Sequence, residues 1–448
     1  MTEPGPPPQG GPLGVYVHWP YCARICPYCD FNVYRDRGRR GEQAALVEAI
    51  LRDLTAQAEL TGPRTLVSVF FGGGTPSLMD PDAVALILET ARRLWTPAAD
   101  LEVSLEANPT DGETRRFSAL AQAGVGRLSL GVQALDDDAL RFLGRDHDAA
   151  TARRALEVAA RAFGRVSLDL IYARPGQTPQ AWAAELEDAL SYGAEHISPY
   201  QLTIEAGTAF DRAVRRGQLI PPDDEAAAVL FETTQEVLTA AGFEAYEVSN
   251  HARGEAARSR HNLVYWRGWD YVGVGPGAHG RITLVGRRHA TEAQARPAAY
   301  IEEVAESGRG FALMEALSAT EAAEERVLSG LRIEAGVPYH EVPVLGLSPT
   351  HDRVKSLVAE GLLRDNNFKL SATPAGRLVL DHVTRRLLVW RRRLPCCFRP
   401  ANPAPHGSPC RSATPVRPAL VARALCRGDA DRQPTRHHPA RPGRAVGG

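Results

Sequence analysis

The sequence predicts an α/β fold, in which a partial (β/α) barrel is followed by a smaller, mainly helical domain of winged-helix type. From residue 13 to about residue 300, apolar runs with the composition of strands alternate with helical stretches rich in Ala, Leu, Glu and Arg. After residue 300 this alternation stops, and two helical runs precede a short strand-like run. Repeated βα units imply parallel strands, whose functional loops meet at the carboxyl ends of the strands.

Seven apolar runs are candidates for strands, and most of the stretches between them are long enough for a crossover helix. The strand candidates are residues 14–19, 66–71, 101–107, 127–133, 165–172, 196–203 and 244–249. The helical candidates are residues 81–95, 111–123, 148–162 and 178–192. About six such units suit a partial barrel. Because periodicity cannot distinguish this barrel from a flat, doubly wound sheet, the sheet is the alternative architecture.

The second domain has its own helix signals. The spacing of Ser318 and Glu321 is that of a capping box and predicts the start of a helix that continues to residue 332. A second helical run, 350–363, precedes a strand and turn within 368–380. Two helices followed by a short strand are typical of a winged-helix domain, a fold that often binds DNA. Since this domain lacks a basic recognition face, we expect no nucleic-acid partner.

Both ends of the chain differ from the rest in composition, so the predicted division has four parts. Residues 1–12 are Pro/Gly-rich and predicted to be disordered, 13–300 form the barrel domain, 301–386 the C-terminal domain, and 387–448 a tail. The tail has no helical or strand period, so it is either disordered or the product of a shifted reading frame, which is the interpretation we favour. Its four cysteines are therefore not counted as ligands: Cys396, Cys397, Cys410 and Cys426.

Charge and hydropathy restrict the location and the partners of the protein. The formal net charge of −1 indicates neither a nucleic acid nor an anionic membrane surface as a partner. The N-terminal segment lacks the basic and apolar regions of a signal peptide. No apolar run approaches the ~18 residues that a membrane span requires. We therefore expect a cytoplasmic protein without a transmembrane segment.

Three of the seven cysteines form a tight group. Cys22, Cys26 and Cys29 follow the first predicted strand with the spacing C-x3-C-x2-C. In a reducing cytosol such a triplet suggests metal binding rather than disulfides. Zinc is the alternative, but a structural zinc site takes four ligands, usually from C-x2-C knuckles. The spacing favours a [4Fe–4S] cluster whose fourth iron stays open, and we expect the nearby His18 to order this loop by hydrogen bonding.

A glycine-rich motif, FFGGGTPS (70–77), follows the second predicted strand. Consecutive glycines let a ligand approach the backbone closely, because no Cβ is in the way. The motif matches neither the dinucleotide fingerprint nor the P-loop. Beside a cysteine loop that follows the neighbouring strand, it predicts a site for the methionyl amino group of S-adenosylmethionine (SAM), which can chelate the open iron of a cluster.

Taken together, the motifs from Tyr16 to about Gly280 resemble the coproporphyrinogen dehydrogenase-like (HemN-like) branch of the radical SAM superfamily, and in detail its HemW-type heme chaperones. The motifs that carry the resemblance are YVHWPYC, CPYCDF, FFGGGTPS, SLEANP, RLSLGVQ, LGRDH, SLDLIYARPGQT, SPYQLTIE, YEVSNHA and RHNLVYW. The resemblance implies a barrel of the radical SAM type, reductive cleavage of SAM at the cluster, and an electron donor such as flavodoxin or ferredoxin.

The resemblance also implies which residues line the SAM pocket. They are Tyr16, Gly72, Gly73, Thr75, Glu106, Gln133, Arg145 and Asp169. Glu106 and Asp169 can accept hydrogen bonds from ribose hydroxyls or the amino group, and Arg145 can pair with the SAM carboxylate as a bidentate fork. Tyr28 could stack on the adenine, although packing within the loop is the alternative.

Two functions remain open within this branch. The oxygen-independent coproporphyrinogen III oxidases carry a fourth cysteine in the loop, where this chain has Phe31. That difference argues against the decarboxylase and for a heme chaperone that passes heme to an acceptor protein. The resemblance assigns heme binding to the motif HNLVYW, in which His261 could ligate the iron while Tyr265 and Trp266 face the porphyrin. The alternative is that these aromatic residues belong to the core.

Overall fold

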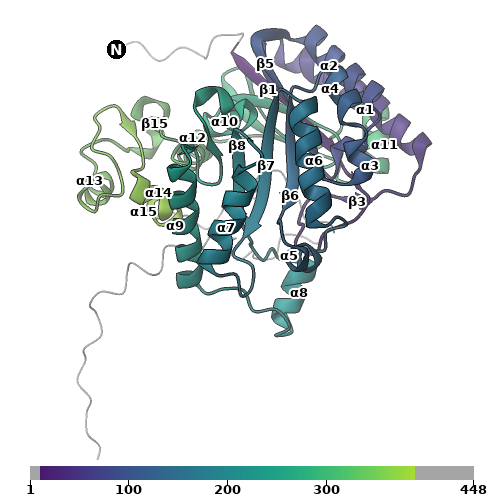
Figure 1. Cartoon of the computed structure of the whole chain (residues 1–448). Helices are drawn as coiled ribbons and strands as arrows, with labels where there is room; N and C mark the ends of the chain where they lie inside the picture. The colour runs from purple at the N-terminus through teal and green to yellow at the C-terminus, as the bar shows by residue number, and fades with distance from the viewer. Residues whose placement is uncertain (1–10, 389–448) are drawn as a thin grey trace, which may run out of the picture.

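A sheet of twelve strands runs through most of the chain in the computed structural model, which describes residues 11–388 (Figure 1). The strand order is β14-β13-β12-β11-β1-β4-β5-β6-β7-β8-β10-β9. The central strands are mutually parallel: β11 (Asp270–Val274), β1 (Pro12–Trp19), β4 (Thr65–Gly73), β5 (Thr96–Ala107), β6 (Arg127–Gln133), β7 (Arg165–Tyr172) and β8 (His196–Gln201). Antiparallel strands extend both edges: β9 (Glu244–Ala245), β10 (His251–Ala252), β12 (His279–Leu284), β13 (Arg287–Ala293) and β14 (Phe311–Ala316).

Helices cover the outer face of this sheet, and several neighbouring helices pack against one another. They are α1 (Arg40–Thr61), α2 (Pro81–Leu94), α4 (Phe117–Gln122), α6 (Ala149–Ala162), α7 (Pro179–Leu190), α9 (Asp224–Ala240) and α11 (Pro297–Ser307). Local signals start several of them, since Asp80, Asp148 and Thr178 accept hydrogen bonds as N-caps. Short helices lie near the carboxyl ends of the parallel strands: α3 (Asp111–Thr114), α5 (Asp137–Phe142) and α8 (Ala209–Arg215).

The inner face of the sheet is polar and is filled at one end by α10 (Arg260–Trp266). Residues of β4 alternate, so that Val69 and Phe71 lie in the hydrophobic core under the helices while Ser68 hydrogen-bonds His261 of α10 on the other face. A curved sheet with helices in sequence order on its outside is a partial barrel. The predicted fold class is therefore confirmed, and the doubly wound alternative does not apply.

The predicted elements agree with the structure except in three places. The first six strand candidates are strands, but the seventh, 244–249, shrinks to the two residues of β9 because Glu247 turns its carboxylate back onto the Ser249 amide. The predicted helix 111–123 is interrupted, and forms α3 and α4. The parallel strand β11 and the antiparallel strands β12 to β14 were not predicted.

The predicted domain boundary at residue 300 differs from the structure. Helix α11 packs on α1, and β14 pairs with β13 as the edge of the large sheet, so both belong to the barrel domain. The second hydrophobic core begins at Ala323. At the outer boundaries, Pro12 starts β1 and Leu387 ends α15, whereas the rest of the predicted disordered segment and tail lies outside the described residues.

The C-terminal domain is small and mainly helical (Figure 1). Its elements are α12 (Ala319–Gly330), β15 (Val337–Pro338), α13 (Asp352–Ala359), β16 (Lys369–Leu370), α14 (Pro374–Leu378) and α15 (Leu380–Leu387). The predicted capping box is confirmed, because the Ser318 hydroxyl and the Glu321 carboxylate each bond the other residue's backbone amide. Strands β15 and β16 pair antiparallel as a short ribbon beside the helices.

A buried ion pair joins the two domains. Arg332, at the end of α12, donates to Glu247 at 2.8 and 3.2 Å, and the Glu247 side chain is fully buried. The Arg332 guanidinium also stacks over the Trp266 ring at 4.4 Å from its centroid. Arg332 of the C-terminal domain therefore makes both an ion pair and a ring contact with the barrel domain.

We expect Arg332→Ala to destabilise the protein by about 1.5–3 kcal/mol, the usual value for hydrogen bonds to a charged group, because Glu247 keeps only its contacts to Ser249 and Asn250. Urea unfolding measures the loss. The matched control is Arg385→Ala, which removes an exposed arginine of the same domain. Equal unfolding midpoints for the two variants would show that the pair does not contribute to stability.

Candidate functional site

The three clustered cysteines lie at the carboxyl end of β1. Cys22 ends the two-residue strand β2 (Tyr21–Cys22), which pairs with β3 (Tyr34–Arg35), and the loop between these strands carries Cys26 and Cys29. Within the loop, the Cys29 amide donates to the Cys26 carbonyl at 3.2 Å. The loop therefore presents all three thiols from a single turn between two anchored strands.

Buried side chains fix the far end of this cysteine loop. The Nε2 atom of His18 donates to the Asn32 carbonyl at 2.9 Å, while its Nδ1 atom accepts from the Tyr16 hydroxyl at 3.0 Å. Burial lowers the pKa of His18 to about 4, so the ring is neutral in this role. The Asn32 amide in turn donates to the Pro276 and Ala295 carbonyls. The expectation that His18 orders the loop is confirmed.

The glycine-rich segment VGVGPGAHG supports the same loop. A Cβ at Gly275 would lie 2.2 Å from the His18 carbonyl, and one at Gly277 would lie 2.5 Å from the Asn32 amide. Both glycines also have positive φ, which disfavours other residues. The segment therefore needs glycine in order to pack under the cysteine loop, and not in order to contact a planar ligand.

The thiols lie in a desolvated environment. Burial raises the pKa of Cys22 to about 11 and that of Cys29 to about 12, so both are protonated before they bind a metal, and metal binding releases the protons. Within residues 11–388, no three His, Cys, Asp or Glu side chains converge as a single metal ion requires. Each thiolate of a cubane cluster binds a different iron, so a cluster does not need that convergence.

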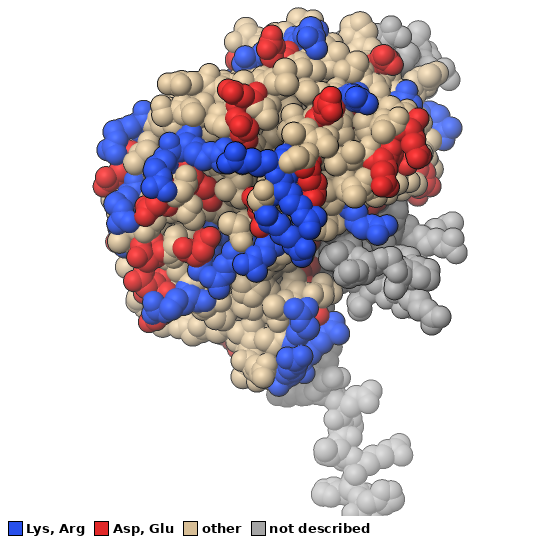
Figure 2. Space-filling model, turned by 90° about the vertical axis from the view of Figure 1, so that its right-hand side faces the viewer, with Lys and Arg blue, Asp and Glu red and all other residues tan. Residues whose placement is uncertain are grey.

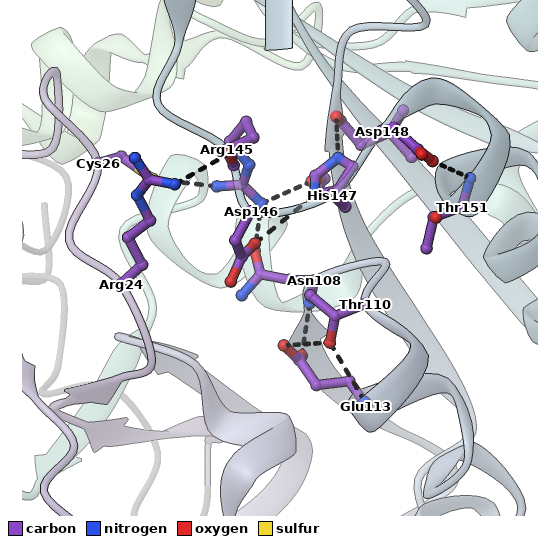
Figure 3. Close-up of polar contacts among 12 residues, drawn as sticks. Arg24, Cys26, Asn108, Thr110, Glu113, Arg145, Asp146, His147, Asp148 and Thr151 are labelled. Carbon is purple, nitrogen blue, oxygen red and sulfur yellow. Dashed lines mark hydrogen bonds and ion pairs between the residues drawn. The ribbon is translucent and has the colours of Figure 1, made fainter. Parts of the chain in front are cut away.

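Arg145 connects the cysteine loop to the ends of the neighbouring strands (Figure 3). Its Nη1 atom donates to the Cys26 sulfur at 3.2 Å, and its Nη2 atom donates to the Gly131 carbonyl at 3.0 Å and to the Asn108 side chain. Its Nε atom is buried without a hydrogen-bond partner. A buried unpaired donor is costly, so Nε is the atom of Arg145 best placed to receive an anionic ligand.

The GGGT loop packs between the cysteine loop and the inner face. A Cβ at Gly73, whose φ is +108°, would lie 2.5 Å from the His18 ring, and a Cβ at Gly72 would lie 2.9 Å from the Tyr16 ring. Thr75 accepts a hydrogen bond from the Asn108 amide at 3.1 Å. The Gly73 amide donates to the Glu106 carboxylate at 3.1 Å. The loop therefore joins the predicted pocket residues of β4 and β5.

Two buried carboxyl groups face each other across the inner surface. Burial raises the pKa of Glu106 to about 8, and the negative charge of the neighbouring Asp169 contributes a smaller effect in the same direction. Burial also raises the pKa of Asp169, against the opposing effect of hydrogen bonds from Ser129 and other hydroxyl groups. A cationic ligand group would favour the ionised form of this pair.

Further polar atoms on the inner face have no partner. Gln133 ends β6 with a φ of +66°, a strained conformation for this residue, and its Oε1 atom is buried and unbonded. The hydroxyl of Ser104, on the same face of β5 as Glu106, is likewise unbonded. With the Nε atom of Arg145, these atoms form an incomplete polar lining that a ligand with amino, carboxylate and hydroxyl groups would complete.

Tyr16 and Tyr28, the two tyrosines predicted to contact SAM, lie in different surroundings from each other. Tyr16 is buried on the inner face, where it stacks on Phe70 and bonds His18, below the predicted pocket residues. Tyr28 packs 6.2 Å from the Phe210 ring, and its hydroxyl receives Arg145 at 3.4 Å. This position corresponds to the loop-packing alternative and not to a free stacking surface.

His261 lies in the floor of the barrel, and this arrangement differs from the predicted heme ligand. Ser68 bonds its Nδ1 atom at 2.9 Å and Tyr265 bonds its Nε2 atom at 2.7 Å, while Phe70 stacks on the ring. Burial lowers the pKa of His261 to about 3. Neither ring nitrogen is free for a heme iron, and Trp266 is occupied by the domain interface. Arg260, which precedes His261 in the chain, pairs with Asp100.

The sequence analysis missed two residues of this site. Asn108, within the SLEANP motif, links Arg145 to Thr75, and its position directly after a predicted strand was the available signal. Glu113 is buried and accepts from the Asn108 amide at 2.7 Å and from Ser77. It lies in a polar helical run, where no pattern distinguishes it from a surface residue.

Comparison with known proteins agrees with this geometry. Sequence models of the radical SAM superfamily and of the HemN C-terminal domain match residues 16–189 and 317–379. The mitochondrial radical S-adenosyl methionine domain-containing protein 1 of Bos taurus is 40% identical, over 87% of this chain and 91% of that protein. The heme chaperone HemW of Mycobacterium tuberculosis is 38% identical, over 85% and 96%.

The fold has a solved counterpart. The structure of coproporphyrinogen III oxidase (HemN) from Escherichia coli, described as a radical SAM enzyme, matches with a TM-score of 0.70 and 22% identity, and covers 85% of this chain and 90% of that one. At this identity the match shows a shared fold and nothing about function. Across residues 11–388, none of the helices combines the length and the apolarity that a bilayer crossing demands.

Proposed function

The chain belongs to the HemW-type proteins of the HemN-like branch of the radical SAM superfamily, and from this membership we propose that it is a heme chaperone, which holds a [4Fe–4S] cluster and SAM and passes heme to an acceptor protein. The observation that carries the proposal is the loop of Cys22, Cys26 and Cys29 beside an incomplete polar lining. Phe31 follows this loop with its ring about 40% exposed and supplies no fourth thiol.

Each part of the proposed site has a chemical role. Cys22, Cys26 and Cys29 hold the cluster, which when reduced supplies the electron that cleaves the sulfonium of SAM. Arg145 meets the SAM carboxylate through its unpaired Nε atom, and Glu106 accepts from an amino or hydroxyl group.

The cluster needs an electron donor, and the surface supports an acidic one. Figure 2 shows basic side chains gathered in a band across the face that carries α1 and β3. Arg35, Arg37, Arg39 and Arg40 are exposed in the segment that follows the cysteine loop. An acidic electron-transfer protein of the flavodoxin or ferredoxin kind fits such a band through charge complementarity.

The predicted cytoplasmic location remains a prediction, since relatives named as mitochondrial exist.

A paired assay tests the function against the alternative. We expect the reconstituted protein to bind heme, detected as a Soret band in an anaerobic titration, and not to convert coproporphyrinogen III when SAM and an electron donor are supplied. Transfer of the bound heme to an apo-protein acceptor would complete the case. Formation of protoporphyrinogen IX would contradict the chaperone and establish the oxidative decarboxylase in its place.

SAM affinity is expected to rise with pH. Glu106 has a pKa of about 8, and the cationic groups of SAM favour its ionised form, so SAM binding releases a proton. The dissociation constant should therefore fall by up to about tenfold per pH unit below pH 8 and level off above it. Equilibrium binding at pH 6.5, 7.5 and 8.5 measures this slope.

Glu106→Gln is the control for this pH dependence. It cannot ionise, so any slope that remains in this variant belongs to other groups, such as Asp169 or the amino group of SAM itself. A wild-type dissociation constant that does not change between pH 6.5 and pH 8.5 would contradict the role of Glu106.

A further inference from the structure

A cleft of about 590 Å³ lies against the cysteine loop, within the usual size range of small-molecule sites. Cys26 and Cys29 line one side, and the other sides come from the end of α5 and the start of α8. The Phe210 amide donates to the Pro27 carbonyl at 3.0 Å and so fixes α8 to the loop. The cleft is therefore a defined space next to the proposed cluster and distinct from the polar inner face.

The cleft has an apolar, aromatic wall. The rings of Phe142 and Phe210 stack with centroids 4.9 Å apart and an interplanar angle of 29°. Ile25 contributes a side chain that is 47% exposed, whereas Phe210 is only 7% exposed and supports Phe142 from within the core. The apolar surface that a planar ligand can reach therefore comes from the half-buried Phe142 and from Ile25.

Three arginines surround this apolar wall. Arg24, Arg141 and Arg212 all line the cleft, and all three are exposed. Arg24 donates to the Arg145 carbonyl at 3.4 Å, and Arg212 donates to the Gly207 carbonyl at 2.8 Å. Neither pairs with a carboxylate among residues 11–388.

Arg141 does have a carboxylate partner, but this partner lies one turn away on the same helix and at the protein surface. It pairs with Asp138 of the same helix, and both side chains are largely exposed. Such surface pairs contribute little, so this arginine can turn to a new partner at small cost. The cleft thus combines an apolar wall with three guanidinium groups that are available to anions.

We propose that this cleft is the tetrapyrrole site, which packs the heme ring on Phe142 and Ile25 and binds its propionates through Arg24, Arg141 and Arg212. This inference rests on the proposed heme chaperone function and gives it a location that His261 does not provide. An apolar macrocycle with two carboxylates matches an apolar wall beside arginines, because guanidinium groups bind carboxylates bidentately. No histidine lines the cleft, so recognition depends on the carboxylates and not on the iron.

Two comparisons test the site in the anaerobically reconstituted full chain. The first compares heme, metal-free protoporphyrin IX and protoporphyrin IX dimethyl ester on the wild type. We expect the first two to bind with similar affinity, and the ester to bind roughly ten- to a hundredfold more weakly, as expected for lost contacts to charged groups. Absorbance follows heme, and porphyrin fluorescence follows the other two.

The second comparison uses charge-neutralising variants. The triple variant Arg24→Gln, Arg141→Gln and Arg212→Gln should lose affinity for heme by a similar factor and keep its iron and sulfide content. The matched control replaces three exposed arginines of the outer helices: Arg52→Gln, Arg93→Gln and Arg161→Gln. It removes the same charge and should bind heme as the wild type does.

The outcomes separate this inference from the function on which it rests. If the wild type binds no tetrapyrrole, the chaperone proposal and the site both fail. If heme binds but the ester binds equally well, or the triple variant matches its control, the site is wrong while the chaperone proposal stands. The ester comparison needs no variant, so it can still overturn the site even if the triple variant loses its cluster.

Discussion

Replacing Cys22, Cys26 and Cys29 together by Ala should abolish the iron–sulfur absorbance of the anaerobically reconstituted protein. A cubane cluster is held by thiolates, and these three come from the single loop between β2 and β3. The loop itself should remain in place, because His18 and Asn32 hold it through bonds to other backbone groups. Iron and sulfide analysis, together with the visible spectrum, measures the loss.

The C-terminal tail supplies the matched control for this experiment. Replacing its four cysteines by Ala should leave the cluster unchanged, because the tail is not counted among the ligands: Cys396, Cys397, Cys410 and Cys426. Circular dichroism of both variants separates loss of the cluster from loss of the fold. Iron and sulfide at the wild-type level in the loop variant would remove these cysteines from the metal site.

The parallel part of the fold could be predicted because its signals are local. Strands β1 and β4 to β8 each contain an apolar run, and caps such as Asp80 and Thr178 mark the helices between them. The parallel strand β11 and the antiparallel strands β12 to β14 gave no such signal. Gly273 and Gly280 occur there because other backbone segments approach closely, which is a requirement of the tertiary structure that a sequence pattern does not reveal.

The candidate site likewise has residues that the sequence identifies and contacts that only the structure shows. The cysteine spacing and the GGGT motif are short, so the sequence locates Cys22 and Gly73, and the resemblance adds Glu106 and Arg145. What the sequence could not determine is which partner each side chain meets. His261 has the residue type of a heme ligand, but only the structure shows that Ser68 and Tyr265 occupy both ring nitrogens.

Arg145 illustrates a residue for which the structure refines the prediction. The resemblance implies a bidentate fork for the SAM carboxylate, yet both Nη atoms already donate, to Cys26 and to Gly131 and Asn108. Only Nε is buried without a partner. The guanidinium therefore serves two purposes, since it orders the cysteine loop from one edge and offers a free donor to the ligand from the other.

Arg145→Ala should weaken SAM binding by roughly ten- to a hundredfold, the equivalent of ~1.5–3 kcal/mol for a lost contact to a carboxylate. The three cysteines remain, so we expect the cluster to persist, with its spectrum altered by the loss of the hydrogen bond to the Cys26 sulfur. Arg145→Lys keeps the charge but not the planar fork, and should recover only part of the affinity. Arg154→Ala, which removes an exposed arginine of α6, is the control that should bind SAM normally. Equilibrium binding to protein of matched iron content makes the comparison independent of cluster loss, and wild-type affinity in Arg145→Ala would exclude this arginine from the SAM pocket.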